Sequence, residues 1–125
     1  MSMPIVKPKS VFYKAFKRDE FKCVYCGRDL LENLDTFASC HLDHLRPKKF
    51  GGQDNEEFNR VAACGVCNSI KGSFDPLPGE AVTAESFSRA VQAAREYIKQ
   101  KRCDEERCSY VRDYKYWLEE AGRNR

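Results

Sequence analysis

The pattern of hydrophobic and polar positions along this chain predicts both helices and short strands, and therefore an α+β fold. Ser10 suits the N-cap of a helix predicted over residues 11–18. Apolar stretches at residues 38–45 and 59–63 are short enough for strands. Between them, residues 48–55 are polar and contain two glycines, which is typical of a loop.

The last third of the chain has the period of amphipathic helices. Thr83 is the predicted cap of a helix over about 84–101, and a second helix is predicted over about 105–120, stopped by Gly122. The first helix carries an apolar stripe that we interpret as a packing face, formed by Phe87, Val91, Ala94 and Ile98.

A length of 125 residues fits one domain, taken as 1–125, with a core over about 19–73 and a helical extension over about 83–121. No apolar run is long enough to cross a bilayer, and the first residues lack the apolar stretch of a signal peptide, so we expect no membrane association and a cytoplasmic location. The net charge of +3 is mildly basic and indicates nucleic-acid binding only weakly.

Four of the seven cysteines form two Cys-x-x-Cys pairs, Cys23 with Cys26 and Cys64 with Cys67. Two such pairs supply the four thiolates of a closed tetrahedral zinc site, which has no open position for chemistry. Such a zinc ion would clamp the ends of the 37-residue spacer that holds both histidines of the chain. The alternatives are a redox pair or free thiols.

The spacer and the residues after it supply the parts needed to cut a phosphodiester. A histidine such as His44 suits a general base near neutral pH. Asp43 and Asn68 offer the oxygen ligands that a hard cation prefers, and Asn59 is the candidate orienter of the base.

These residues resemble the HNH endonuclease family in order, spacing and type, from about Phe21 to Gly72. The resemblance implies a ββα-metal core, a β-hairpin followed by a helix around one divalent cation, flanked here by an N-terminal helix and two C-terminal helices. It further implies that Asp43 and Asn68 bind the cation, His44 activates water and Asn59 fixes His44. The expected products carry a 5′ phosphate and a 3′ hydroxyl.

Asn68, the adjacent pair of Asp43 and His44, and His41 each raise a separate question about the candidate site. The family often has histidine at the position of Asn68, and an amide ligand favours Mg²⁺ or Mn²⁺ over softer metals. Asp43 and His44 are adjacent, so both serve one phosphate only if the strand bends or ends there. His41 shares a face with Asp43 and is either a further contact to metal or phosphate or a half-exposed strand residue.

Basic side chains near the cluster are candidate phosphate contacts, with a solvated loop as the alternative. Lys71 is favoured because it lies one helical turn after Asn68. The other candidates are Arg46, Lys48, Lys49 and Arg60. The basic residues of the C-terminal helices alternate with acids, which is typical of a solvated surface, with a DNA-contacting flank as the less favoured alternative. These basic residues are Lys99, Lys101, Arg102, Arg107 and Arg112.

The sequence thus predicts an HNH endonuclease that hydrolyses DNA with one catalytic metal and His44 as general base. Two other hypotheses stay open: a zinc-stabilised nucleic-acid-binding module that does not cut, and an interaction protein whose C-terminal helices dock a larger machine. The sequence gives no oligomeric state and no target site.

Overall fold

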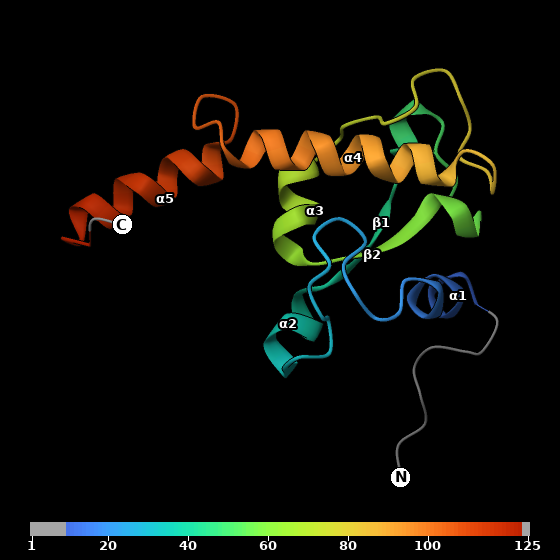
Figure 1. The fold of residues 1–125 in the computed structure, drawn as a ribbon, viewed down its shortest axis with the longest axis horizontal. Coiled ribbons are helices and arrows are strands. Elements are labelled where there is room, and N and C mark those ends of the chain that lie inside the picture. Colours follow the sequence, from blue (N-terminus) through green and yellow to red (C-terminus); the bar gives the residue numbers. More distant parts are fainter. Residues whose placement is uncertain (1–9, 124–125) are drawn as a thin grey trace, which may run out of the picture.

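A short antiparallel hairpin lies at the centre of the protein, whose computed structural model describes residues 10–123 (Figure 1). The helices and strands, in chain order, are α1 (Val11–Arg18), α2 (Leu34–Ser39), β1 (His41–His44), the 3₁₀ turns η1 (Lys48–Phe50) and η2 (Glu57–Asn59), β2 (Arg60–Ala63), α3 (Gly65–Lys71), α4 (Phe87–Arg102) and α5 (Ser109–Glu120). The two strands pair with His41 opposite Ala63 and His44 opposite Arg60. This register fixes where Asp43 and His44 lie relative to α3.

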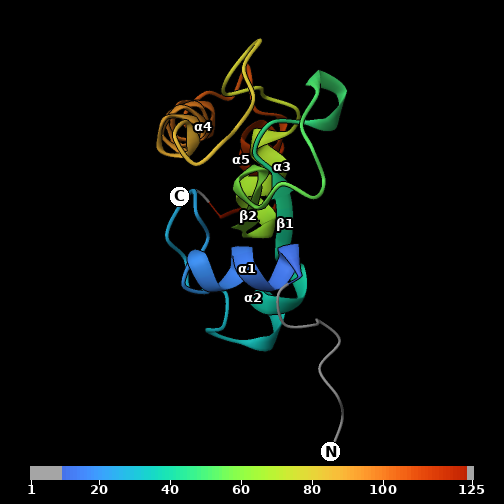
Figure 2. The same ribbon diagram turned by 90° about the vertical axis from the view of Figure 1, so that its right-hand side faces the viewer.

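Helices cover the hairpin from opposite sides. In both ribbon views α4 lies on the side of α3, and α1 lies on the other side (Figures 1 and 2). Arg18, at the end of α1, donates to the backbone oxygens of Glu57 and Arg60, both at 2.6 Å, and Asp19 accepts from the Ala62 N–H at 2.9 Å. The end of α1 therefore holds β2 in place through charge-assisted hydrogen bonds.

The core joins the hairpin to α4. Val61 and Ala62 of β2 are fully buried, and α4 contributes Ala90, Val91, Ala94 and Ile98. The predicted stripe of α4 thus packs as expected at Val91, Ala94 and Ile98, whereas Phe87 is half-buried. By contrast α5 has no buried residue and extends away from the hairpin (Figure 1). Among the described residues no helix combines the length and apolarity that a membrane span needs.

The predicted α+β fold with a β-hairpin followed by a helix is confirmed, but the first strand is shorter than predicted. It begins at His41 rather than Ala38, because α2 extends through Ser39. The side chain of Asn33 caps α2 by accepting from the Thr36 N–H at 2.8 Å. This local capping interaction outweighs the strand propensity of residues 38–40.

Both C-terminal helices begin later than predicted. The Ser86 hydroxyl accepts from the Thr83 N–H at 2.8 Å and donates to the Ala81 carbonyl at 3.0 Å, which closes a turn ahead of α4. The carboxylate of Asp104 accepts from the N–H groups of Glu106 and Arg107, so a turn precedes α5. In each case a short polar side chain captures N–H groups before a helix can.

Candidate metal and nuclease site

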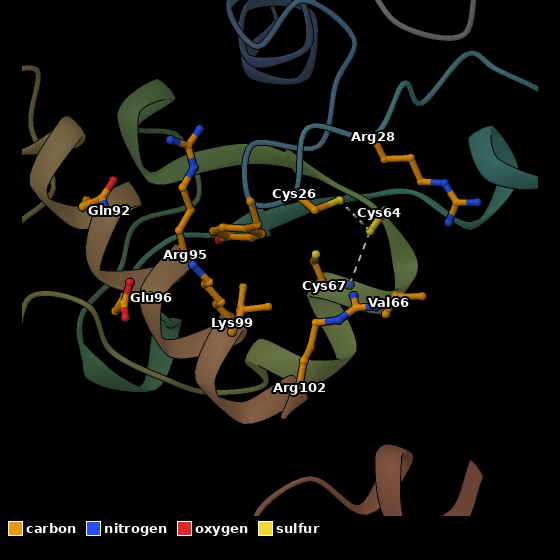
Figure 3. A pocket seen from close by; sticks show the side chains of 12 residues that line it. Cys26, Arg28, Cys64, Val66, Cys67, Gln92, Arg95, Glu96, Lys99 and Arg102 are labelled. Atoms are coloured by element: carbon orange, nitrogen blue, oxygen red, sulfur yellow. Dashed lines mark hydrogen bonds between the residues drawn. The ribbon is translucent and has the colours of Figure 1, made fainter. Parts of the chain in front are cut away.

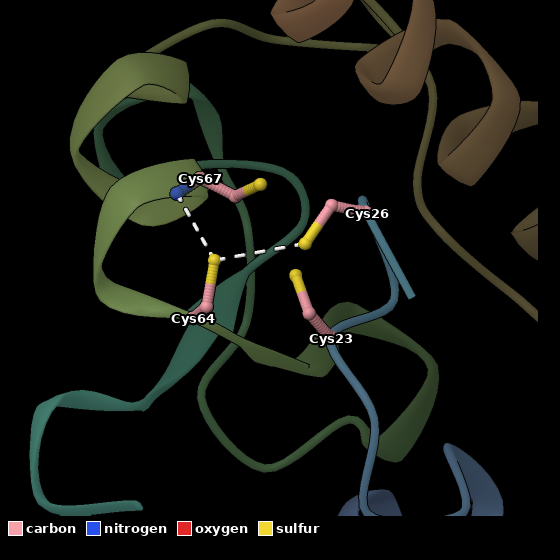
Figure 4. Close-up of side chains that lie close together, drawn as sticks. All are labelled: Cys23, Cys26, Cys64 and Cys67. Carbon is pink, nitrogen blue, oxygen red and sulfur yellow. Dashed lines mark hydrogen bonds between the residues drawn. The ribbon is translucent and has the colours of Figure 1, made fainter. Parts of the chain in front are cut away.

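The four paired cysteines converge at one point between the turn after α1 and the start of α3 (Figure 4). Their sulfur atoms all lie within 4.8 Å of one another, and Cys26 and Cys64 are 3.8 Å apart. Cys23 and Cys26 flank a turn that ends at Gly27, whose φ of 80° suits glycine. Cys64 caps α3 and accepts from the Cys67 N–H at 3.4 Å.

This cluster fits a zinc ion. A tetrahedron with Zn–S bonds of about 2.3 Å has sulfur–sulfur edges of about 3.8 Å, close to the Cys26–Cys64 separation. Cys23, Cys64 and Cys67 are buried, which protects a closed site from exchange. Hydrogen bonds from the Cys23 and Cys67 thiols lower the pKa of Cys64, so this sulfur is the readiest to become a thiolate. The residues present therefore match a structural zinc site.

Asp43 has two partners on one of its carboxylate oxygens. The Tyr25 hydroxyl donates to its Oδ2 at 2.6 Å, and Lys71 Nζ lies 3.3 Å from the same atom. Burial raises the pKa of Tyr25, and the Asp43 charge adds to this effect. Burial lowers the pKa of Lys71 against the opposing effect of Asp43. Among residues 10–123 no hydrogen bond is made to Oδ1, which leaves that atom for a cation.

His44 ends β1, and its ring meets a carboxylate from the following loop. His44 Nε2 lies 2.5 Å from Asp54 Oδ1. An ionised carboxylate can only accept, so Nε2 carries the hydrogen and the neutral ring has its lone pair on Nδ1. Hydrogen bonds from His44 and Lys48 lower the pKa of Asp54, which keeps it ionised.

Asn59 is buried and holds the loop after β1 rather than the His44 ring. Its Oδ1 accepts from the Arg46 N–H at 2.8 Å, and its Nδ2 donates to the carbonyls of Arg46 and Gln53 at 3.1 and 3.0 Å. No hydrogen bond joins the Asn59 and His44 side chains within the described part of the chain. Any effect of Asn59 on His44 must therefore pass through this loop.

Lys71, a predicted phosphate contact, is buried, and its contact to phosphate stays a prediction. Its side chain has 0% exposure, and Nζ donates to the His44 carbonyl at 3.0 Å besides its ion pair with Asp43. Asn68, one turn earlier on α3, is half-buried. The helical spacing gives the face on which Lys71 lies but not what covers that face, so its burial did not follow from the sequence.

The other predicted phosphate contacts divide into two kinds. Arg46 pairs with Asp75 at 3.4 Å, and Arg60 donates to the carbonyls of Asp54 and Leu42, both at 3.0 Å, so these two residues hold the loop and the strand. Lys48 and Lys49 are exposed, although Lys48 lies 3.1 Å from Asp54. Lys48 and Lys49 remain available for phosphate.

Part of this chain is similar in sequence to known endonucleases. The profile of the HNH endonuclease family matches residues 23–74, which include both cysteine pairs, the hairpin and α3. Residues 23–74 form an HNH endonuclease domain. The CRISPR-associated endonuclease Cas9 of Corynebacterium diphtheriae is 34% identical over 61 residues, which cover 49% of this chain and 5% of that protein. Cas9 of Actinomyces naeslundii is 35% identical over 51 residues, 41% of this chain and 4% of that protein. No solved structure matches.

His41 belongs to the HNH domain but not to its histidine–carboxylate pair. It is exposed at the start of β1 and lines a groove with residues of α2 and α3, among them Ser39 and Ser69. Its contact to metal or phosphate stays a prediction.

Two residues of the HNH domain site were missed from the sequence. Asp54 lies in a polar loop where any of several side chains could face His44, so spacing gives no preference. Tyr25 lies between Cys23 and Cys26, and its contact with Asp43 depends on the cysteines bringing distant segments together. The one sequence feature that distinguishes Tyr25 is its place inside the Cys23-x-x-Cys26 pair.

Proposed function

We propose that this HNH domain hydrolyses phosphodiester bonds of DNA by a one-metal mechanism in which His44 is the general base. The observation that carries the proposal is the His44–Asp54 pair at the end of β1, next to Asp43. A histidine with one nitrogen held by a carboxylate and the other carrying a lone pair is arranged to take a proton.

The candidate cation ligands are Asp43, through Oδ1, and Asn68. A bound Mg²⁺ or Mn²⁺ would polarise the phosphate and stabilise charge on the leaving oxygen. Hard oxygen ligands from a carboxylate and an amide suit these two ions. Lys71 and the Tyr25 hydroxyl hold Oδ2 of Asp43 and thereby fix the direction in which Oδ1 points.

The chain's own residues then account for the proton. Nδ1 of His44 accepts it from the attacking water, and the imidazolium that forms is stabilised by Asp54 on Nε2. Asn59 keeps the loop carrying Asp54 close to β1 through its bond to Gln53. Lys48 and Lys49 are exposed in the loop after β1, which supports a role for them as contacts to phosphates next to the cut.

A plasmid-nicking assay with Mg²⁺ or Mn²⁺ tests the proposal. Wild type is expected to nick, and His44→Ala is expected to lose about 10²–10⁴-fold in rate because the base is absent. Zinc content and circular dichroism of the variant should match wild type, since His44 lies outside the cysteine cluster. Wild type that stays inert with every divalent ion tried would overturn the proposal.

One observation favours a second candidate, a zinc-stabilised DNA-binding module without turnover. Oδ2 of Asp43 is already taken by Tyr25 and Lys71, which leaves a single oxygen for a cation. In that case wild type binds DNA and retains zinc but shows no metal-dependent nicking. The same assay therefore separates the two candidates.

A further inference from the structure

A groove of about 590 Å³ lies between the cysteine cluster and α4 (Figure 3). One wall is formed by Tyr25, Cys26 and residues of α3, and the other is formed by α4. Arg95, Lys99 and Arg102 line the α4 wall, at the i, i+4, i+7 spacing that places residues on one face of a helix. This basic stripe lies in a groove, which favours the DNA-contacting flank over the solvated surface that the charge pattern of the sequence indicated first.

The charge of this stripe is not neutralised by neighbouring acids. None of Arg95, Lys99 and Arg102 forms an ion pair with another residue in the range 10–123. The fourth cation of the groove, Arg28, is paired with Glu32 at 2.7 Å. The only carboxylate among the lining residues is Glu96. The α4 wall of the groove, with three cations and Glu96, therefore presents net positive charge to an anionic ligand.

Backbone contacts fix α4 beside this groove. Arg95 Nε donates to the Val24 carbonyl at 2.7 Å, which ties α4 to the zinc-binding turn. Lys101 Nζ donates to the Ile70 carbonyl, also at 2.7 Å, which ties α4 to α3. Ala94 and Ile98 of α4 are buried, and Ile98 also lines the groove. A cationic row held on a rigid helix loses little entropy when it binds a strand of phosphates.

The groove adjoins the candidate nuclease site through one side chain. Tyr25 lines the groove and donates its hydroxyl to Asp43 at 2.6 Å. A DNA strand lying along α4 would thus be separated from Asp43, the candidate cation ligand, by the Tyr25 side chain alone. The groove is distinct from the loop surface of Lys48 and Lys49.

We propose that the groove lined by Arg95, Lys99 and Arg102 binds the phosphate backbone of DNA beside the segment that is cut. This proposal rests on the proposed function for its choice of DNA as ligand. The competing explanation is that the three cations only offset the net charge of −2 carried by four thiolates and Zn²⁺. The two explanations differ in what is lost when the cations are removed.

The test measures binding of a fluorescent duplex to the full chain in a His44→Ala background, without added Mg²⁺ or Mn²⁺, over a series of salt concentrations. We expect Lys99→Gln with Arg102→Gln to weaken binding several-fold and to reduce the slope of log Kd against log salt by about 2, because each phosphate contact contributes about 0.9. Glu96→Gln should tighten binding, since it removes the one acid of the groove.

Lys14→Gln with Lys17→Gln is the matched control, because it removes the same charge from exposed positions of α1, a helix that lies on the other side of the hairpin from α4 (Figure 2). An equal loss in the control pair would reduce the effect to net charge and overturn the proposal. Unchanged DNA affinity with lowered zinc retention in the groove pair would also overturn it, in favour of charge compensation. Wild type that cuts while the groove pair binds normally refutes the groove alone. Wild type that binds through the groove without cutting refutes the nuclease alone.

Discussion

Asp54 is an exposed loop residue whose carboxylate meets three different groups. His44, Lys48 and Arg60 all lie within 3.7 Å of its oxygens. Its lowered pKa means that these contacts are present at neutral pH and are lost only as the pH falls in acid through that lowered value. We therefore assign Asp54 as a positioning residue that acts through His44.

Asp54→Asn should lower kcat for nicking by about 10–100-fold with a smaller change in KM, because the amide cannot stabilise the imidazolium of His44. Steady-state kinetics on a supercoiled plasmid would measure this. The exposed neighbour makes a control, and Asn55→Ala should behave as wild type. Equal kcat values for Asp54→Asn and wild type would remove Asp54 from the mechanism.

Gly52 lies where the loop after β1 folds back against the backbone of Arg46. A Cβ atom there would stand 1.7 Å from the Arg46 carbonyl oxygen and 2.9 Å from Asn59 Nδ2. Gly52→Ala should therefore displace the loop and lower the free energy of unfolding by about 1–3 kcal/mol, measured by urea denaturation. Gln53→Ala keeps the backbone carbonyl that Asn59 uses and should cost far less. Similar losses in the two variants would contradict this account of the loop.

Among the helices and strands, those whose position is set by neighbouring residues could be predicted from the sequence. The helix of residues 11–18 followed from Ser10, whose hydroxyl accepts from the Tyr13 N–H at 3.1 Å. The four-cysteine cluster followed from two paired spacings, and the hairpin followed from two strand-like stretches and the resemblance to the HNH family. The late start of β1 did not, because Asn33 caps a helix in a stretch that is also compatible with a strand.

The candidate site was predictable in its residue types but not in its contacts. Asp43 and His44 are adjacent in sequence, yet their side chains meet different partners, Lys71 for Asp43 and Asp54 for His44. β1 ends at His44, as a shared phosphate requires. The burial of Lys71 could not be predicted, because it depends on α3 packing against β1 across a long stretch of sequence.

For the whole molecule, the cysteine cluster joins the turn after α1 to the start of α3. Removing zinc with a chelator, or Cys26→Ser, should lower the Tm by about 10 °C or more, since structural zinc binding contributes several kcal/mol to small domains. Differential scanning fluorimetry with elemental analysis would report both Tm and one zinc per chain. Cys103 is exposed and lies outside the cluster, so Cys103→Ser should change neither. A Tm that is insensitive to Cys26→Ser would contradict a stabilising zinc site.

Tyr25 gives the molecule a shared wall, with its ring in the basic groove and its hydroxyl on Asp43. If DNA in the groove changes how Tyr25 holds Asp43, the DNA site and the cation site are linked thermodynamically. The factor by which one ligand alters the affinity of the other is then the same in both directions. A divalent cation that tightens DNA binding must itself be held more tightly when DNA is present. Titrating the divalent cation with and without DNA would then report whether DNA occupies the groove next to Tyr25.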